Sequence, residues 1–160
     1  MLLIPHALAG AAVAGLLRRP ALAYPAAVAS HLVLDVVPHL DSHGLFGAPQ
    51  GGPTPLEATA GVLDFLVACA LMLWLVRGRA DRRLLLGGAF CGMLIDLVNH
   101  VPPWGPWFSA WPGTAWLSDL HAAVGHGVQP AQWPLGVGTQ VVTVALSLWV
   151  ILRAGRRAPA

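Results

Sequence analysis

Apolar residues fall into five long runs along this chain, and short stretches that carry most of the charge separate them. The runs cover residues 2–17, 20–39, 56–76, 84–101 and 134–152. A helix needs about 20 apolar residues to cross the hydrocarbon core of a bilayer, and the last three runs approach that length. The first run is shorter and rich in alanine and glycine, which favours close packing between helices. The pattern predicts an all-α integral membrane bundle of about five transmembrane helices, organised as one domain over residues 1–160.

The composition points to the same class of protein. Hydrophobic residues make up 56% of the chain and charged residues 10%, whereas soluble domains carry about 25% charged residues. The mean hydropathy is +0.67. Cys69 and Cys91 lie within apolar runs, so we interpret them as packing residues. The few basic residues do not form a nucleic-acid-binding surface, and the expected partners are membrane lipids.

The basic residues indicate how such a bundle is oriented. All nine are arginines, and they follow the first, third and fifth apolar runs: Arg18, Arg19, Arg77, Arg79, Arg82, Arg83, Arg153, Arg156 and Arg157. Basic residues next to membrane spans stay on the cytoplasmic side. The sequence therefore predicts a multi-pass protein of the inner (plasma) membrane, with its N-terminus outside and its C-terminus inside. The loops at 40–55 and 102–133 would then face the outside or periplasm.

The second of these loops is rich in tryptophan. It holds five of the seven tryptophans: Trp104, Trp107, Trp111, Trp116 and Trp133. Tryptophan favours the boundary between membrane and water, so we expect this loop on the outer leaflet. Two interpretations stay open, a plain aromatic belt and a lid or lipid-entry surface over a functional site.

The most informative polar pattern lies at the end of the second run, SHLVLDVVPHLD. His31, Asp35 and His39 follow one another at steps of four residues, which places them on one face of a helix. An unpaired carboxylate or imidazole in an apolar environment is costly, so these side chains need partners. The sequence predicts that other runs supply them.

A second Asp-x-x-x-His pair, Asp96 and His100, ends the fourth run, and Asp96 follows Asp35 by 61 positions (96 − 35 = 61). The first run carries His6 and the third carries Asp64, 58 positions later (64 − 6 = 58). A duplicated helical hairpin followed by a final helix explains this pattern, and chance similarity is the alternative.

Ionisable groups within a membrane indicate a functional site by default. The apolar runs hold no central lysine or arginine to pair with these carboxylates, so a divalent metal ion is the simplest compensating charge. Histidine and aspartate bind zinc, manganese and iron, and we expect one to three ions, most simply zinc. The candidate ligands are His6, His31, Asp35, His39, Asp64, Asp96, His100 and His121.

Several catalytic motifs are absent from the sequence. It has no His-Glu-x-x-His, no Gly-x-Ser-x-Gly and no phosphate-binding Walker loop. An enzyme built on this chain would therefore use metal-activated water as its nucleophile. The candidates for acid–base or orienting roles are Asp41, Asp64 and His121. His121 is favoured over His126 in the outer loop, Gln140 is a candidate to orient a histidine, and His43 is expected to be a loop residue.

Two stretches carry a resemblance to a known family. PHALAGAAVAG…SHLVLDVVPHLD in the N-terminal half and LHAAVGHGVQ…LGVGTQ near the C-terminus resemble the YdjM-like bacterial inner-membrane proteins, which are described as metal-dependent hydrolases. That family is distantly similar to zinc-dependent phospholipase C, an all-helical fold with a His/Asp multi-metal site. The resemblance implies a hydrolase directed at a phosphoester or lipid. The residues to which it assigns the site are His6, His31, Asp35, His39, Asp41 and His121.

Other classes of function fit parts of the pattern. Asp35, Asp64 and Asp96 are also candidates for stations in a metal or proton conduit, although the inner halves of the runs carry no titratable path. Two facing histidines are typical of a haem-binding bundle. A structural subunit whose polar residues only specify helix packing is the remaining alternative.

Overall fold

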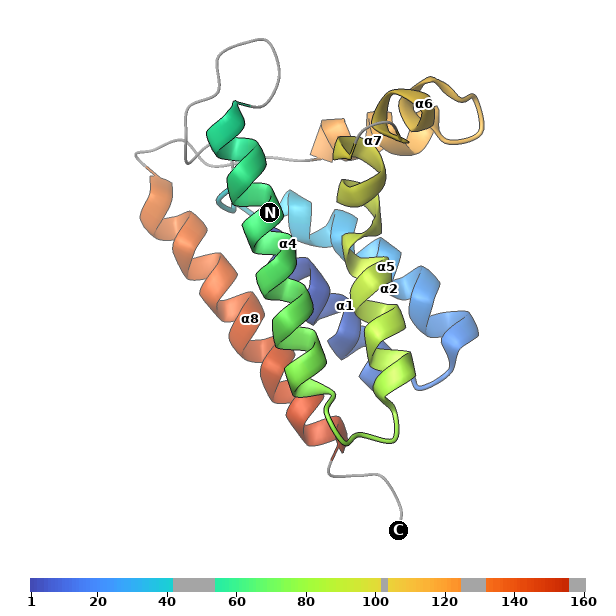
Figure 1. The fold of residues 1–160 in the computed structure, drawn as a ribbon, viewed down its shortest axis with the longest axis vertical. Coiled ribbons are helices and arrows are strands. Elements are labelled where there is room, and N and C mark those ends of the chain that lie inside the picture. Colours follow the sequence, from blue (N-terminus) through green and yellow to red (C-terminus); the bar gives the residue numbers. More distant parts are fainter. Residues whose placement is uncertain (42–53, 102–103, 125–131, 156–160) are drawn as a thin grey trace.

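The computed structural model describes residues 1–41, 54–101, 104–124 and 132–155, and within these ranges the chain is helical and has no β-strands. The helices are α1 (Leu3–Leu17), α2 (Pro20–Val36), α4 (Pro55–Leu75), α5 (Arg82–His100), α6 (Trp104–Ala110), α7 (Ala115–Val124) and α8 (Trp133–Gly155). Figure 1 shows α1, α2, α4, α5 and α8 as a bundle, with α6 and α7 at one end of it. The predicted all-α class is confirmed.

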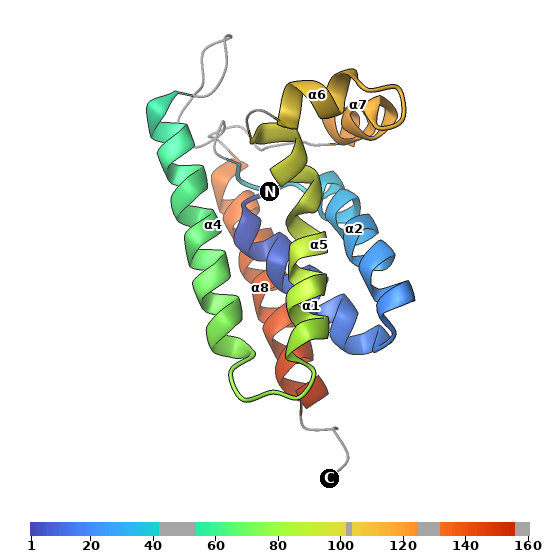
Figure 2. The ribbon, with the colours of Figure 1, turned by 45° about the vertical axis from the view of Figure 1, so that its right-hand side comes forward.

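Helix α1 is the centre of the bundle. It contacts α2, α4, α5 and α8, and Figures 1 and 2 show it between them. A helix that is apolar on all sides is buried on all sides, and the small residues of α1 allow its neighbours to approach closely. Ala7, Leu8, Ala11 and Ala14 have no exposed surface. The central position of α1 places His6, on its first turns, in the interior.

The closest approach joins α1 to α5 through glycines. A Cβ atom built on Gly92 would lie 2.3 Å from the carbonyl oxygen of His6, and one built on Gly10 would lie 2.3 Å from the carbonyl oxygen of Gly88. Real Cβ atoms do not approach that closely, so only glycine permits this contact. The contact fixes the position of His6 along the bundle axis relative to the polar residues at the end of α5.

Two helices are long and apolar enough to cross a membrane. They are α4, with 21 residues, and α8, whose apolar stretch runs from Trp133 to Ala154. The bent pair formed by α5 and α6 is a third if it counts as one span. Helices α1 and α2 are apolar but shorter, with 15 and 17 residues. The structure thus agrees with a membrane protein, while five spans stay a prediction.

The second apolar run ends earlier as a helix than its pattern predicts. Helix α2 stops at Val36, and Val37 is extended, with ψ of 135°. A residue that precedes a proline disfavours helical geometry, and Pro38 follows Val37. The predicted shared face therefore holds for His31 and Asp35, but the prediction was wrong to place His39 on it.

The predicted outer loop at 102–133 contains regular structure. Its described parts form α6, which makes an angle of 89° with α5, and α7. The hydrogen bonds of Thr114 to Phe108 and Trp111 close the connection between these helices. Most of the other predicted loop, 40–55, lies outside the described residues.

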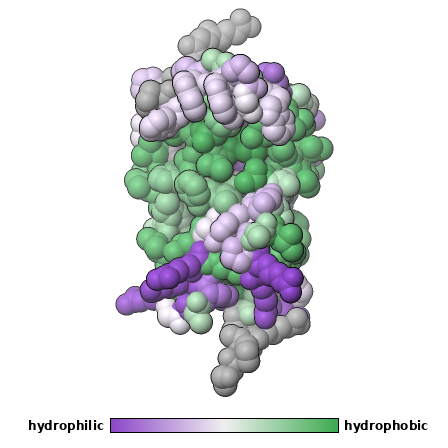
Figure 3. Space-filling model, turned by 90° about the vertical axis from the view of Figure 1, so that its right-hand side faces the viewer, coloured by the Kyte–Doolittle hydropathy of each residue, from purple (hydrophilic) through white to green (hydrophobic). Residues whose placement is uncertain are grey.

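The described arginines lie at the end of the bundle opposite to α6 and α7. Arg79 forms two hydrogen bonds with the carboxylate of Asp81, at 2.9 and 2.8 Å, and donates a third to the carbonyl oxygen of Ile151 at 2.9 Å. The bond to Ile151 fastens the α4–α5 connection to the end of α8. Figure 3 shows the strongly hydrophilic surface at this end of the face drawn.

The two predicted hairpins pack differently. Helices α1 and α2 are in close contact, whereas α4 and α5 scarcely touch, and α4 is mostly exposed. The sequence similarity between the hairpins therefore does not extend to their packing.

Candidate metal centre

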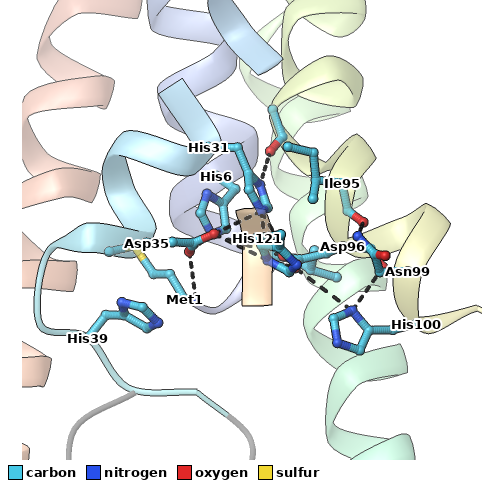
Figure 4. A network of polar contacts seen from close by, with 12 residues as sticks. Met1, His6, His31, Asp35, His39, Ile95, Asp96, Asn99, His100 and His121 are labelled. Atoms are coloured by element: carbon cyan, nitrogen blue, oxygen red, sulfur yellow. Dashed lines mark hydrogen bonds and ion pairs between the residues drawn. The ribbon is translucent and has the colours of Figure 1, made fainter. Parts of the chain in front are cut away.

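Five predicted ligands meet at one point inside the bundle. They come from four helices, with His6 on α1, His31 and Asp35 on α2, Asp96 on α5 and His121 on α7. Figure 4 shows their side chains pointing toward one another. His6 and His31 are fully buried, and the side chains of Asp35, Asp96 and His121 are 2%, 17% and 15% exposed.

Three of these side chains, those of His31, Asp35 and His121, have the spacing of ligands around a single ion, and Asp96 lies beside them. The oxygen Oδ2 of Asp35 lies 3.0 Å from Nε2 of His31 and 3.3 Å from Nε2 of His121, and the two nitrogens are 3.4 Å apart. The oxygen Oδ1 of Asp96 lies 3.3 Å from Nε2 of His121 and 3.6 Å from that of His31. Two ligands that are each about 2.1 Å from a tetrahedral zinc ion lie about 3.4 Å apart. The three distances among His31, Asp35 and His121 therefore match the edges of a tetrahedral site, with Asp96 beside it.

The orientation of these atoms also fits a shared cation. Oδ2 of Asp35 is buried and has no hydrogen-bond partner, although two imidazole nitrogens lie within 3.3 Å of it. Both ring nitrogens of His6 are likewise buried without a hydrogen-bond partner. Such groups are costly unless a further partner satisfies them. A cation at the point where the ligand atoms converge supplies that partner.

The ring of His31 is held in place by the backbone of α5. Its Nδ1 lies 2.7 Å from the carbonyl oxygen of Gly92, an acceptor, so Nδ1 carries the proton and donates it. In the neutral imidazole the other nitrogen, Nε2, then carries the lone pair, and it faces the carboxylate of Asp35 where the side chains converge. Histidine ligands in metalloproteins characteristically show this arrangement.

His6 occupies a second position beside the first. Its ring stacks on that of His31, with centroids 3.9 Å apart, and its Nε2 lies 3.2 Å from Oδ1 of Asp35 and 4.0 Å from Oδ2 of Asp96. These two oxygens are the second oxygens of the carboxylates whose other oxygens contact His31 and His121. Within the described residues, two groups are compact enough to hold an ion: His31, Asp35 and His121, and His6, His31 and Asp96.

His121 lies outside the long apolar helices, and its charge state reflects the two carboxylates. Burial lowers the pKa of this imidazole, but the carboxylates of Asp35 and Asp96, each 3.3 Å from its Nε2, outweigh that effect and raise the pKa to about 9. The site therefore attracts positive charge, whether a proton or a metal ion. The α-amino group of Met1, 3.2 Å from Oδ1 of Asp35, is a further cation at the site.

The structure places Asp64 next to the backbone of α1. Its Oδ2 accepts a hydrogen bond from the backbone N–H of Leu3 at 2.5 Å. A carboxylate at this position caps the start of a helix and satisfies one of its free N–H groups. Asp64 belongs to neither compact group of possible ligands, and its contact is one that positions the helix of His6.

His39, Asp41 and Gln140 lie to one side of the cluster. The ring of His39 is buried, and its Nδ1 lies 2.7 Å from the carbonyl oxygen of Val37. Figure 4 shows this ring apart from the converging side chains. Gln140, a candidate to orient a histidine, donates to the carbonyl oxygen of Leu40 at 2.9 Å. Asp41 is half-buried beside these residues, and His43 and His126 lie outside the described residues.

His100 lies at the rim of the site. Its side chain is 63% exposed, its Nδ1 is 3.9 Å from Oδ1 of Asp96, and its ring meets that of His121 edge-on at 6.0 Å. The neighbouring Asn99 accepts a hydrogen bond from the hydroxyl of Ser118 at 2.7 Å, which ties α5 to α7. Sequence reasoning did not single out Gly92, Asn99 or Ser118. Their contacts join residues far apart in the chain, and no local spacing pattern marks them.

Comparisons with known proteins returned no family model, no curated protein and no solved structure that matches this chain. The case for its function therefore rests on the geometry of the cluster.

Proposed function

We propose that this protein is a membrane-embedded, metal-dependent hydrolase that acts on a phosphoester or lipid substrate through metal-activated water. The observation that carries the proposal is the convergence of His31, Asp35 and His121 at the ligand spacing of a single ion, with Asp96 beside them.

The donor set favours zinc, with manganese or iron as alternatives. Neutral imidazole and carboxylate are ligands of all three ions, and the compact tetrahedral spacing is typical of zinc. Asp35 and Asp96 together balance the charge of one divalent ion. The stacked His6 offers a ligand to a second ion, so the proposal covers one to three ions.

The arrangement fits the division of roles in a hydrolytic site. Catalytic zinc sites have three protein ligands and keep one position for water, whose pKa the ion lowers to about 7. His31, Asp35 and His121 would hold the ion as such a set of three, and Asp96, whose Oδ1 lies 3.3 Å from Nε2 of His121, would act as the base for the water that the ion activates. His100, exposed at the rim, is placed to return a proton to the leaving alcohol as the phosphoester bond breaks.

A purely conducting role has less support. Below the cluster, the described core around α1 includes Ala7, Leu8, Ala11, Leu85 and Ala89, whose apolar side chains offer no polar path. An apolar core beneath the cluster fits an enzyme better than a conduit.

The proposal includes a topology. We place α1, α2, α4, α5 and α8 across the inner (plasma) membrane, with the N-terminus outside and the arginine end in the cytoplasm, so that the metal centre opens to the outside or periplasm. The separation of the described arginines from the His/Asp cluster supports this orientation.

Elemental analysis of the detergent-purified protein tests the metal centre. We expect one to three equivalents of zinc, manganese or iron in the wild type, and a clear loss in Asp35→Asn, which keeps the shape of the side chain and removes its charge. The matched control is Asp119→Asn on α7, because this aspartate is exposed. A folded wild type that takes up no divalent metal after dialysis against zinc, manganese or iron would refute the proposal.

A hydrolase assay tests the reaction. The metal-loaded protein is incubated with a chromogenic phosphodiester and with phospholipid in mixed micelles, beside Asp96→Asn. We expect release of the alcohol or of the phosphorylated headgroup, and a loss of at least about 100-fold in Asp96→Asn, the size typical of a lost general base. Metal binding without turnover of either substrate would argue against the hydrolase and leave a binding role.

A further inference from the structure

Helices α6 and α7 form a hairpin that lies across one end of the bundle, which Figure 2 shows clearly. This α6–α7 hairpin covers residues 104–124 and includes Trp104, Trp107, Trp111 and Trp116, which are 60%, 61%, 50% and 61% exposed. Trp107 and Trp111 stack on each other, with centroids 5.7 Å apart. So much exposed indole on one short segment indicates a surface that contacts something other than water.

The position of the hairpin indicates what that partner is. In Figure 1 it lies level with the starts of α4 and α8, the two helices long enough to cross a membrane. On the face drawn in Figure 3, an apolar belt separates the pale surface at the hairpin end from the strongly hydrophilic surface at the arginine end. The hairpin is therefore continuous with the rim of the apolar belt, where lipid headgroups meet hydrocarbon.

The chemistry of the hairpin fits this boundary. Tryptophan combines a large apolar ring with one N–H donor and gathers where membrane meets water. Residues 104–124 contain no lysine or arginine and one acid, Asp119, so attraction to negatively charged headgroups does not hold the hairpin. A neutral or zwitterionic lipid surface is the partner that matches this composition.

The hairpin also delivers a ligand to the metal centre. None of the residues of α7 is fully buried, so packing alone anchors this helix weakly. Within the described residues, its side-chain ties to the bundle include the Ser118–Asn99 hydrogen bond and the contacts of His121 with His31, Asp35 and Asp96. The position of His121 in the site therefore depends on where the hairpin rests.

We propose that the α6–α7 hairpin is a lipid-surface anchor that holds His121 on the metal centre, so that lipid contact and metal binding strengthen each other. The inference rests on the proposed metal centre and adds a partner and a form of regulation to it. Coupling between two sites is reciprocal, so each side can be measured through the other.

Fluorescence quenching in vesicles tests the lipid contact. The background variant carries Trp74→Phe, Trp133→Phe and Trp149→Phe, which leaves the four hairpin tryptophans as reporters. In zwitterionic vesicles we expect strong quenching by lipids brominated near the glycerol end of the acyl chain and weak quenching by lipids brominated near the methyl end. Quenching by a water-soluble quencher alone would overturn the proposal.

Zinc affinity tests the coupling. We compare wild type with the triple variant Trp104→Ser/Trp107→Ser/Trp116→Ser in zwitterionic nanodiscs, by competition with a chromophoric chelator. We expect zinc binding about tenfold weaker in the triple variant, the lower end of what misplacing a ligand costs. The control is Trp74→Ser, which removes an equally exposed tryptophan, at 69%, near the other end of α4, and which should leave zinc affinity unchanged.

The possible results separate the two proposals. If the triple tryptophan variant binds zinc as tightly as the wild type, the proposed coupling is wrong and the proposed metal centre is unaffected. A wild type that takes up no zinc, manganese or iron removes the proposed function and the coupling with it. Reciprocally, removal of zinc should reduce quenching of the hairpin tryptophans by the shallow brominated lipid, and unchanged quenching would contradict the coupling.

Discussion

His31 and Gly92 join the two helices that carry the carboxylates of the site. Nδ1 of His31 donates to the carbonyl oxygen of Gly92 at 2.7 Å, across 61 positions of sequence. The same glycine faces α1, where a Cβ atom would lie 2.3 Å from the carbonyl oxygen of His6. One residue without a side chain thus sets the positions of two histidines.

Gly92→Ala is therefore expected to damage both the fold and the site. The added methyl group meets backbone rather than a flexible side chain, so α1 and α5 must separate, at a cost of about 1–3 kcal/mol. Metal content should fall together with the midpoint of thermal unfolding, measured on the purified protein.

Gly61→Ala provides the matched control. A Cβ atom on Gly61 has no neighbour within 4 Å, and the residue lies inside α4. Alanine there should stabilise the helix by roughly 0.5–1 kcal/mol and leave metal content unchanged. Equal effects of the two substitutions would show that close packing at Gly92 is not what holds the site.

Local pattern identified much of the cluster in advance. His31 and Asp35 lie within one helix, so their four-residue spacing was enough to place them on one face. The same spacing failed for His39, because Val37 precedes Pro38 and leaves the helical conformation. Periodicity describes a helix but does not say where the helix ends.

Contacts between distant segments could not be read from local pattern. Both His121 and Asp64 were predicted ligands, but only His121 joins a compact group. Its place there depends on α7 folding back over the bundle. The stretch before α7 is rich in proline, glycine and tryptophan and has no helical period that would predict this fold. Likewise, no spacing rule indicates that Asp64 meets the backbone of Leu3.

The contact of Asp64 with Leu3 leads to a second prediction. Asp64→Leu removes the acceptor for the first turn of α1 and should destabilise the protein by about 1 kcal/mol, the usual cost of a lost helix cap. Asp64→Asn keeps an oxygen acceptor and should retain most of the stability. Thermal unfolding of both variants provides the comparison.

Metal content separates a positioning role for Asp64 from a ligand role. If Asp64 acts only as a helix cap, the Asp64→Asn protein should keep its metal content, because asparagine can still accept the hydrogen bond. Loss of metal in Asp64→Asn without loss of stability would instead make Asp64 a ligand.

Metal removal is expected to destabilise the folded protein. An ion that binds only the folded state stabilises it by RT ln(1 + [L]/Kd), about 2.7 kcal/mol at a free concentration 100 times Kd. The chelator-treated wild type should therefore unfold at a lower temperature, and added zinc should restore the midpoint. Asp35→Asn should show no response to zinc, whereas a zinc response equal to that of the wild type would place the ion elsewhere.

The arginine end offers a test that is independent of the metal. The Arg79 guanidinium, hydrogen-bonded to Asp81, holds the pKa of this carboxyl below its ordinary value of 3.8. A carboxyl whose pKa is lowered by folding stabilises the protein above its unfolded-state pKa, and this contribution is lost as the pH falls through the folded-state pKa. Asp81→Asn should thus lower the free energy of unfolding at pH 7 by a small amount, below about 1 kcal/mol, because solvent screens the pair.

The difference between wild type and Asp81→Asn should shrink as the pH is lowered below about 4, where the wild-type carboxylate also becomes neutral. Asp119→Asn serves again as the control, because the side chain of Asp119 is exposed and lies at the other end of the bundle, on α7. A wild-type advantage over Asp81→Asn that persists undiminished in acid would show that the charge of the Arg79–Asp81 pair does not stabilise this end of the bundle. The hydrogen bond from Arg79 to Ile151 would then hold that end of the bundle on its own.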